Sequence, residues 1–382
     1  DRLVGSEMCI RDSIKSDFID HFLGLNNSYK EFNTIIFTSS GNLKRGYESE
    51  FVKILNHNPI NEVEIFTVDK YPDLNLVTEV LNKKKNKTLL NSLVLSIGGG
   101  SAMDIAKLYS SCMTESTKTI TDISEIKKDN ENQVLSIAIP TTSGSGAEST
   151  KFTTIWDEKN KQKLSFEDES MLPDFVYLNP KFLVSLPKSL TLSTCLDALC
   201  HSLDSLWNKN KTPESIQLSI EALEIINKYL PLVLKDLANL DIREKLLEAS
   251  NLSGQAINIS RTSLNHSISY PLTSLYKIPH GIACAFSVVS IIKKFYKKIN
   301  KMPGGNLIIE SGNILNTLNL NEDFENLFGQ SFDSTDISKI VLMNSRVTNF
   351  EFEISSKDLN EIIQNSYNCL LYTSPSPRDD QT

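Results

Sequence analysis

The chain has 382 residues, of which 40% are hydrophobic and 23% are charged, a composition typical of a globular protein with one large or two medium domains. Its 39 lysines and arginines against 47 aspartates and glutamates give a net charge of -8, and no basic stripe stands out. Nucleic acid is therefore not expected as a partner.

Two further features bear on the cellular setting. No apolar run reaches the ~18 residues needed to cross a bilayer, and no secretory leader opens the chain, so we expect a cytoplasmic protein with small-molecule partners and no membrane contact. The 6 cysteines are scattered without CxxC spacing, which argues against a disulfide framework or a thiolate zinc site. We expect them to be reduced thiols.

Both ends of the chain look foreign to the rest. Residues 3–13 (LVGSEMCIRDS) and 369–382 (CLLYTSPSPRDDQT) resemble translated sequencing-adapter read-through. We therefore predict sequencing scars at 1–13 and 369–382 and leave both segments out of the fold prediction. Natural disordered tails are the alternative.

Residues 33–140 alternate short apolar strands with amphipathic stretches. The strand-like segments are TIIFTS, EVEIFTV, SLVLSI and VLSIAIP, and helical patterns such as NLVTEVLNKKKN separate them. This alternation is typical of parallel βαβ units, which bind ligands at the carboxyl ends of their strands. The prediction is an α/β domain of nucleotide-binding type over residues 14–187.

After residues 182–189 (FLVSLPKS) the strand signal fades and helical periodicity takes over. Thr212 followed by Pro213 predicts the start of a helix, because threonine can cap free N–H groups and proline fits the first turn. The segments DIREKLLEASNLSGQAIN and SSKDLNEIIQNSYN are likewise amphipathic. We predict an all-helical domain over residues 188–368.

Three glycines, Gly98, Gly99 and Gly100, follow the predicted strand SLVLSI and precede a helix. Without Cβ atoms their N–H groups can approach a pyrophosphate, and the helix adds its positive end. A tight strand-to-helix turn would also use such a triplet, and the G-x-G-x-x-G fingerprint is absent. The triplet alone therefore fits either an anion site or a tight turn.

A second polar loop, IPTTSGSGAEST, also follows a strand. Thr141, Thr142 and Ser145 offer hydroxyl groups, and Gly144 and Gly146 allow close backbone contact with a ligand. Alone, such a sequence is more often a flexible loop than a site. Beside the glycine triplet, it is predicted to flank the same long ligand.

The segment TCLDALCHSLDSLW places Asp197 and His201 four residues apart, on one face of a predicted helix. Alone, this pair is more typical of a surface contact. The other histidines of the helical domain, His266 and His280, complete a set that suits Fe(II) or Zn(II) and leaves a position open for substrate. A cation held there would act as a Lewis acid during hydride transfer.

Five segments together resemble the iron-dependent (group III) alcohol dehydrogenase family over residues 33–368: GGGSAMDIAK, PTTSGSGAEST, LPDFVYLNP, LDALCHSLDSLW and HSISYPLTSLYKIPHG. The resemblance implies a dehydroquinate-synthase-like fold, with an α/β dinucleotide-binding domain followed by an all-α metal-binding domain. It also implies reversible alcohol–aldehyde interconversion in the cleft between them. The metal ligands that it implies are Asp197, His201, His266 and His280.

The same resemblance implies the contacts with the cofactor, NAD or NADP. The residues implied at the pyrophosphate and nicotinamide are Gly99, Gly100, Ser101 and Asp104, those on the other flank are Thr141, Thr142 and Ser145, and those near the ribose and adenine are Lys163 and Leu183. For Lys163 a solvated surface position is the alternative.

Three departures from the family pattern bear on the chemistry. The strand and glycine turn that usually precede Phe32 are missing or replaced. Ser39 stands where many members carry the aspartate that binds the ribose of NAD, and with Lys44 and Arg45 close in sequence NADPH becomes an expected cofactor as well. Tyr270 stands where some members carry a second histidine, so its phenol, ribose or water is expected to relay the proton.

The segments SRTSLNHSISYPLTS and IPHG most resemble the branch of the family that reduces phosphonoacetaldehyde to 2-hydroxyethylphosphonate. Binding an anionic aldehyde requires a positively charged side chain near the metal. The guanidinium group of Arg261 could donate two hydrogen bonds to a phosphonate. The alternative for Arg261 is a carboxylate partner or a place at a helix end.

Other functions stay open at this point. The nearest is a broad short-chain alcohol or diol dehydrogenase of butanol, lactaldehyde or 1,3-propanediol type. More distant ones are a lyase of dehydroquinate-synthase type and a cofactor-binding protein without turnover. We also expect a homodimer, because an exposed first-strand edge often pairs in α/β proteins.

Overall fold

The computed structural model describes residues 33–47, 49, 63–69, 72–84, 92–111, 134–157, 159, 162–318, 320, 324 and 332–373. The chain divides into two compact units. The first contains Asp1–Thr142 and Ala147–Leu183, and the second contains Ser143–Gly146 and Val184–Thr382. The segment predicted to be a scar at 1–13 lies outside the described residues.

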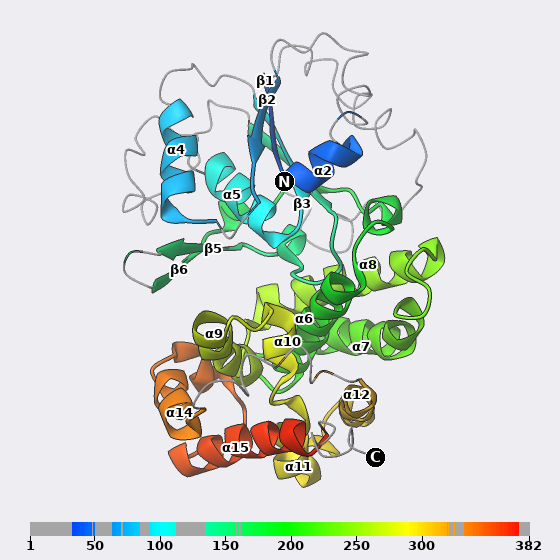
Figure 1. The fold of residues 1–382 in the computed structure, drawn as a ribbon, viewed down its shortest axis with the longest axis vertical. Helices are drawn as coiled ribbons and strands as arrows, with labels where there is room; N and C mark the ends of the chain where they lie inside the picture. The colour runs from blue at the N-terminus through cyan, green and yellow to red at the C-terminus, as the bar shows by residue number, and fades with distance from the viewer. Residues whose placement is uncertain are drawn as a thin grey trace, which may run out of the picture. The chain divides into compact units, whose positions relative to one another are not determined.

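A parallel five-stranded sheet forms the centre of the first unit (Figure 1). Its strands are β1 (Asn33–Thr38), β2 (Val63–Thr67), β3 (Ser92–Gly98), β4 (Val134–Pro140) and β7 (Phe175–Val176). They lie in the order β2-β1-β3-β4-β7, and every neighbouring pair is parallel. The prediction of an α/β fold is confirmed, and β1 to β4 coincide with the four segments TIIFTS, EVEIFTV, SLVLSI and VLSIAIP that were predicted as strands.

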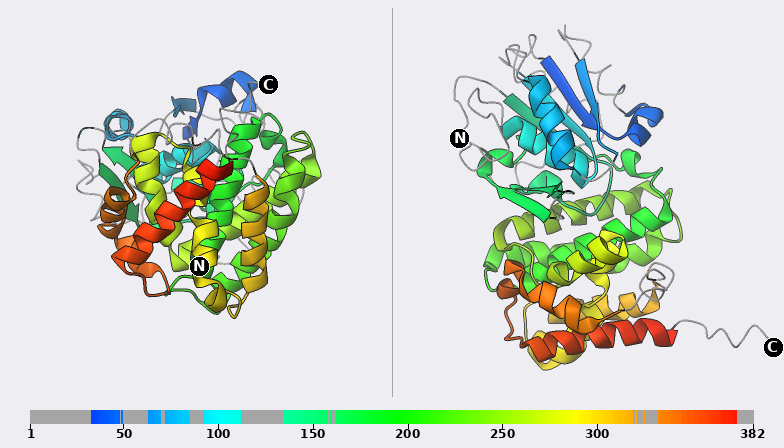
Figure 2. Two further views of the ribbon diagram at one scale, coloured as in Figure 1. Left: turned by 60° about the horizontal axis from the view of Figure 1, so that its bottom comes forward. Right: turned by 60° about the vertical axis from the view of Figure 1, so that its left-hand side comes forward.

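Helices and a hairpin complete the first unit. They are α2 (Ser40–Arg45), α4 (Leu74–Lys84), α5 (Gly100–Ser111), the hairpin of β5 (Phe152–Asp157) and β6 (Gln162–Glu167), and the short 3-10 helices η4 (Ala147–Ser149), η5 (Glu169–Met171) and η6 (Pro180–Leu183). Helices α4 and α5 lie on the same side of the sheet (Figures 1 and 2). Strand β3 is buried along its whole length, as expected for a central parallel strand.

Lys107 ties α5 to the loop before β5. Its Nζ donates hydrogen bonds to Thr150 Oγ1 at 2.9 Å and to the Phe152 carbonyl at 3.0 Å, and the side chain is buried. Burial lowers the pKa of the Lys107 ammonium from 10.5 to about 8, although the charges of Asp104 and Glu148 oppose the change. The buried ammonium is therefore a pH-dependent element of the first unit.

The free energy of unfolding should rise with pH because of Lys107. Below pH 8 the Lys107 amine is protonated in both the folded and the unfolded state, so the folded state bears the full free-energy cost of burying the charge. Between pH 8 and 10.5 the folded state is deprotonated while the unfolded state is still protonated, and this cost is removed. Relative to Lys107→Met, the wild type should gain about 2 kcal/mol between pH 7.5 and 10, measured by urea unfolding. The exposed Lys181→Met should leave the slope unchanged, and equal slopes for wild type and Lys107→Met would contradict this origin.

The second unit is all-helical in its described residues. Its α-helices are α6 (Lys188–Leu206), α7 (Pro213–Val233), α8 (Leu240–Ser260), α9 (Leu264–Tyr276), α10 (His280–Ala285), α11 (Val288–Ile299), α12 (Gly305–Thr317), α14 (Ser334–Leu342) and α15 (Ser356–Thr373), with the 3-10 helix η8 (Ser345–Asn349). Helix α15 thus extends into the segment predicted to be a scar at 369–382. None of the described helices has the length and apolar character needed to cross a bilayer.

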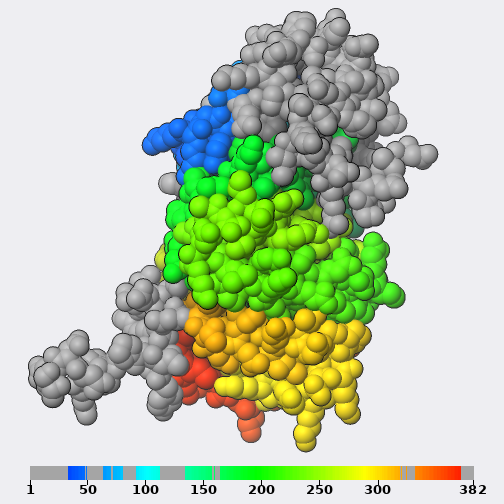
Figure 3. Space-filling model, turned by 90° about the vertical axis from the view of Figure 1, so that its right-hand side faces the viewer, coloured from blue at the N-terminus to red at the C-terminus, as the bar shows by residue number. Residues whose placement is uncertain are grey.

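Capping and buried polar contacts set the arrangement of these helices. Helix α7 begins as predicted: Thr212 Oγ1 accepts the Ser215 N–H at 3.2 Å, and Pro213 is the first helical residue. Asn227 on α7 donates to the Leu307 carbonyl of α12, and the two helices lie side by side on the face shown in Figure 3. Ser366 of α15 donates to Ser290 of α11 at 2.9 Å, and these two helices pack together (Figure 2).

Candidate metal centre and cofactor turn

Helices α6, α9 and α10 bring the four predicted metal ligands together. Asp197 and His201 lie one turn apart on α6, His266 is in the first turn of α9, and His280 is the first residue of α10. The Nε2 atoms of the three imidazoles lie 3.7 Å (His201), 3.3 Å (His266) and 3.7 Å (His280) from the same oxygen, Asp197 Oδ1. Donors from distant parts of the sequence therefore share one centre.

The rings and the carboxylate differ in burial. His201 and His266 stack with ring centroids 4.6 Å apart and an interplanar angle of 8°. Both are buried with Asp197, whereas the His280 side chain keeps 34% exposure. His201 Nδ1 is buried without a hydrogen-bond partner among the described residues. Such an unpaired polar atom in a core is uncommon and points to a functional centre.

The protonation states of Asp197 and His201 suit cation binding, whereas His266 must release a proton to become a ligand: burial opposes its protonation, but Cys284, Asp197 and Asp204 raise its pKa well above the usual range. Burial opposes ionisation of Asp197, but His201, His280 and His266 hold the pKa of its carboxyl well below the usual range. Burial lowers the pKa of His201 to about 4, so this ring is neutral at pH 7. Carboxylates and neutral imidazoles are the ligand forms, and the donor set therefore fits Fe(II) or Zn(II).

Asp204, which the sequence analysis did not select, holds His266 in place. Its buried carboxylate lies 2.8 Å from His266 Nδ1 and also accepts the indole N–H of Trp207 at 3.0 Å. The backbone N–H groups of Ser263, Asn265 and His266 donate to the same carboxylate. Asp204 thus caps α9 from a neighbouring helix, and its contact with Nδ1 leaves Nε2 to face Asp197.

Replacing Asp204 with asparagine should weaken metal binding. The amide lacks the charge that polarises His266 and can present an N–H group to Nδ1, which disfavours the required tautomer. Affinity for zinc, measured by competition with a chromogenic chelator, is expected to fall ~10–100-fold. Asp241→Asn, an exposed change in the first turn of α8, should leave affinity unchanged. An unaltered affinity in Asp204→Asn would refute this positioning role.

The three glycines form the turn between β3 and α5 in the first unit. Gly98 ends β3, Gly100 begins α5, and the Thr141 N–H donates to the Gly98 carbonyl at 2.9 Å. A Cβ at position 99 would lie 3.3 Å from Thr142 Oγ1, so this turn and the residues after β4 are neighbours. The N–H groups of the first turn of α5 are free of helical partners and can bind an anion.

Two other glycines serve helix packing. A Cβ at position 144 would lie 2.6 Å from the Thr194 carbonyl oxygen, and one at position 146 would lie 2.5 Å from the Gly254 Cα. Gly146 also has a φ of +58°, a left-handed conformation that favours glycine. The interpretation of Gly144 and Gly146 as room for a ligand is therefore corrected, because α6 and α8 occupy that space.

The other predicted cofactor residues lie at separate places. Leu183 is buried at the end of η6 and Ser101 is half-buried in the first turn of α5. Ser145 belongs to the second unit. Asp104 accepts the Thr154 N–H at 3.1 Å. Lys163 is in β6, but its side chain lies outside the described part of the structure.

A carboxylate lies near Ser39 after all. Ser39 caps α2 by accepting the Asn42 N–H at 3.1 Å, and the next residue, Ser40, donates its N–H to Asp69 at 2.7 Å. The Ser40 hydroxyl donates to the same carboxylate. These contacts lower the pKa of Asp69, to which the charge of Lys44 contributes. The region around Ser39 therefore does contain an acidic group, Asp69, which lies two residues after the end of β2.

Tyr270 and Arg346 lie beside the candidate metal centre, and Arg261 lies near Arg346. The Tyr270 ring stacks on the His280 ring at 6.4 Å with an interplanar angle of 10°, and the Arg346 guanidinium lies 5.3 Å over the Tyr270 ring. Arg261 ends α8 with a φ of 68°, as the helix-end alternative expected. Asn349 of η8 donates to the Thr262 carbonyl at 2.9 Å, which ties the segment of Arg346 to that of Arg261.

Comparison with known families identifies this architecture. The family model of iron-containing alcohol dehydrogenases matches residues 18–180, and that of the C-terminal part of the same family matches residues 191–306. The chain belongs to the iron-containing alcohol dehydrogenase family. The predicted family, and the predicted fold of an α/β domain followed by a helical domain, are thereby confirmed.

Relatives of this family member differ in their named activities. It is 32% identical over 210 residues to the NAD-dependent methanol dehydrogenase of Bacillus methanolicus, covering 53% of this chain and 55% of that protein. It is 32% identical over 207 residues to the phosphonoacetaldehyde reductase of Streptomyces viridochromogenes, covering 53% and 52%. The matches thus span about half the length of these curated relatives. The sulfoacetaldehyde reductase of Bifidobacterium kashiwanohense, solved with NAD+, shares the fold with a TM-score of 0.77 at 22% identity, covering 95% of this chain and 96% of that one.

Proposed function

We propose that the chain is a metal-dependent NAD(P)H oxidoreductase that interconverts a small aldehyde and its primary alcohol. The convergence of three imidazoles on one carboxylate oxygen, Asp197 Oδ1, carries the proposal. When bound, Fe(II) or Zn(II) would supply Lewis-acid polarisation of the substrate oxygen, and NAD(P)H the hydride. Family membership supports this reaction class over a lyase of dehydroquinate-synthase type.

The chain's own residues would position these groups. Asp197, His201, His266 and His280 would hold the cation, and Asp204 would keep His266 in the right tautomer. In the first unit, the turn at Gly98, Gly99, Gly100 and Ser101 would bind the pyrophosphate through backbone N–H groups. Tyr270, stacked on His280, is proposed to relay the proton through its phenol.

The proposed substrate is phosphonoacetaldehyde, reduced to 2-hydroxyethylphosphonate. Arg346 supports an anionic substrate because its half-buried guanidinium has no ion-pair partner among the described carboxylates. Burial lowers the pKa of Arg346, Asp204 opposes this, and the positive charge of Arg261 lowers it further. Two guanidinium groups near each other are stabilised by an anion between them, and a phosphonate would serve.

Arg346→Met should reduce kcat/KM for phosphonoacetaldehyde about 10–100-fold, the effect of losing charge-assisted hydrogen bonds worth about 1.5–3 kcal/mol. Butanal, a neutral aldehyde, serves as the internal control and should change less than about threefold. Rates would be followed by loss of NAD(P)H absorbance. Equal losses for both aldehydes would contradict an anion site, and an unchanged preference for the charged aldehyde in Arg261→Ala would remove Arg261 from it.

The cofactor is proposed to be NAD or NADP. Ser39 removes the carboxylate that many members use for NAD and so favours NADPH as an additional cofactor. The carboxylate of Asp69 returns a negative charge to this region through its contacts with Ser40, an observation that favours NAD. Comparing kcat/KM for NADH and NADPH in the wild type and in Asp69→Asn would decide which influence dominates.

The second candidate is a broad short-chain alcohol or diol dehydrogenase, favoured by its similarity to the methanol dehydrogenase. The deciding experiment supplies the iron-loaded protein with NADH or NADPH and compares phosphonoacetaldehyde with butanal and lactaldehyde. A kcat/KM higher for the phosphonate supports the proposal, and a preference for neutral aldehydes supports the second candidate. No net cofactor oxidation with any aldehyde would refute both. A homodimer and a cytoplasmic location stay predictions.

A further inference from the structure

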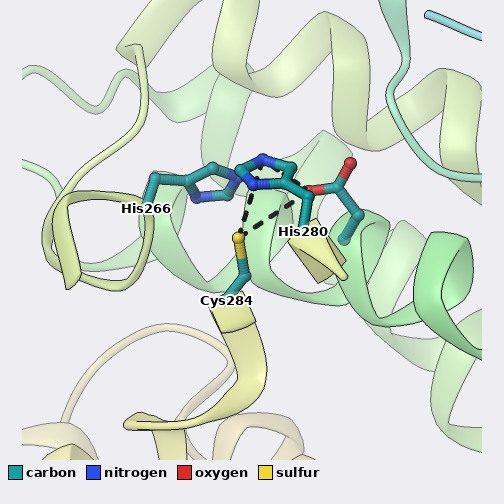
Figure 4. Close-up of side chains that lie close together, drawn as sticks. His266, His280 and Cys284 are labelled. Carbon is teal, nitrogen blue, oxygen red and sulfur yellow. Dashed lines mark hydrogen bonds and ion pairs between the residues drawn. The ribbon is translucent and has the colours of Figure 1, made fainter. Parts of the chain in front are cut away.

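A buried thiol lies within the candidate metal centre. Cys284 is on α10, one helical turn after His280, and its Sγ lies 3.8 Å from His280 Nε2 and 4.0 Å from Asp197 Oδ1. Figure 4 shows the Cys284 thiol directed toward the same point as the rings of His266 and His280. Cys284 is fully buried, so its sulfur has no aqueous environment as an alternative.

The separations between donors are close to, and somewhat longer than, those of a single four-coordinate centre. Metal–ligand bonds of about 2.0–2.3 Å at tetrahedral angles separate neighbouring donor atoms by roughly 3.3–3.8 Å. Asp197, His266, His280 and Cys284 offer donor atoms that all lie within 4.8 Å of one another. His201 is 3.7 Å from Asp197 but is not a member of this compact set of four. A zinc ion could thus reach the sulfur with small side-chain movements.

We propose that Cys284 coordinates zinc at this centre through its sulfur. The inference rests on the metal site of the proposed function, and it places Cys284 beside Asp197, His266 and His280 as a donor, with His201 outside that compact set. Sulfur is a softer ligand than carboxylate or imidazole, and it favours zinc over ions that prefer oxygen. Binding would release the thiol proton to solvent and form a Zn–S bond without any oxidation or reduction. The cation carried by the protein would then depend on Cys284.

X-ray absorption at the zinc edge tests the inference without relying on activity. The wild type, stripped with a chelator and reloaded with one equivalent of Zn(II), should show a sulfur neighbour at about 2.3 Å beside nitrogen and oxygen neighbours at about 2.0–2.1 Å. Cys284→Ala should lose the sulfur neighbour and bind zinc ~10-fold or more weakly. Cys195→Ala removes another buried thiol, on α6, and should retain both signals.

The outcomes separate this inference from the proposed function. One equivalent of bound zinc with only nitrogen and oxygen neighbours in the wild type would overturn the role of Cys284 and leave the proposed metal site standing. Failure of the wild type to bind any zinc, cobalt or iron would overturn both. If Cys284→Ala does not fold, the wild-type spectrum still decides. The cobalt-loaded wild type provides a second readout, since a sulfur ligand gives a near-ultraviolet charge-transfer band that nitrogen and oxygen ligands do not.

Discussion

Asp197→Asn is expected to reduce kcat/KM for aldehyde reduction about 10³-fold or more and to leave the purified protein nearly free of metal. Asp197 Oδ1 lies within 3.7 Å of three imidazole nitrogens, so its charge is the common feature of the candidate centre. A neutral amide is a much weaker ligand, and Lewis-acid polarisation is worth several kcal/mol, which corresponds to about 10³ in rate. Metal content by mass spectrometry and steady-state rates would measure the two effects.

A control variant shows whether the effect comes from losing the carboxylate at the metal centre or from losing any one negative charge of the protein. Asp241→Asn removes a carboxylate from the exposed first turn of α8 and should keep both metal content and rate. A thermal unfolding curve would show whether Asp197→Asn is folded. If the folded variant keeps full metal content and wild-type rates, the assignment of this centre fails.

Gly281→Ala should destabilise the helical unit by about 3 kcal/mol or more, the upper end of overpacking effects. A Cβ at position 281 would lie 1.7 Å from the Ser193 carbonyl oxygen and 3.0 Å from the Asp197 backbone nitrogen. Helix α10 would have to move away from the turn of α6 that carries Asp197, and His280 would move with it. For a unit of this size, the transition temperature should fall by about 6–12 °C, measured by calorimetry.

Gly312→Ala is the matched control for this prediction. Gly312 is also a buried glycine inside a helix, but a Cβ there would meet only the flexible end of Ile292, at 2.9 Å. Its helix propensity gain and this small overlap should nearly cancel, within ~1 kcal/mol. If Gly281→Ala lowered the transition temperature no more than Gly312→Ala, close contact between α6 and α10 would not explain the glycine.

The two predictions concern one arrangement. Helix α6 presents its ligands at adjacent turns, and the other two histidines arrive on helices that begin beside it. Asp204 holds the start of α9, and Gly281 lets the start of α10 approach α6 closely. The Asp204 contacts and the close approach at Gly281 both act at the first turn of a helix, where helices fray. The positions of the donors therefore depend on contacts that carry no metal-binding chemistry of their own.

The features that could be predicted without the structure depend on signals carried by residues close together in the sequence. The alternation of strand and helix predicted the fold class, because strand and helix periods are readable within about ten residues. Thr212 with Pro213 predicted the start of α7 for the same local reason. Asp197 and His201 were found as candidates through their helical spacing, and His266 and His280 through residue type. Their role as metal ligands is a prediction that metal analysis can test.

Residues whose importance depends on partners far away in the sequence became apparent once the chain was folded. Asp204 meets His266 across 62 positions and Cys284 meets Asp197 across 87, and neither separation has a period in the sequence. The spacing of Asp204 from Asp197, two turns along α6, and of Cys284 from His280, one turn along α10, was available but could not be told from ordinary core spacing. A glycine in the sequence indicates that a neighbouring group comes close to the backbone, but it does not indicate which group. At Gly144 and Gly146 the neighbours are helices α6 and α8 and not a ligand.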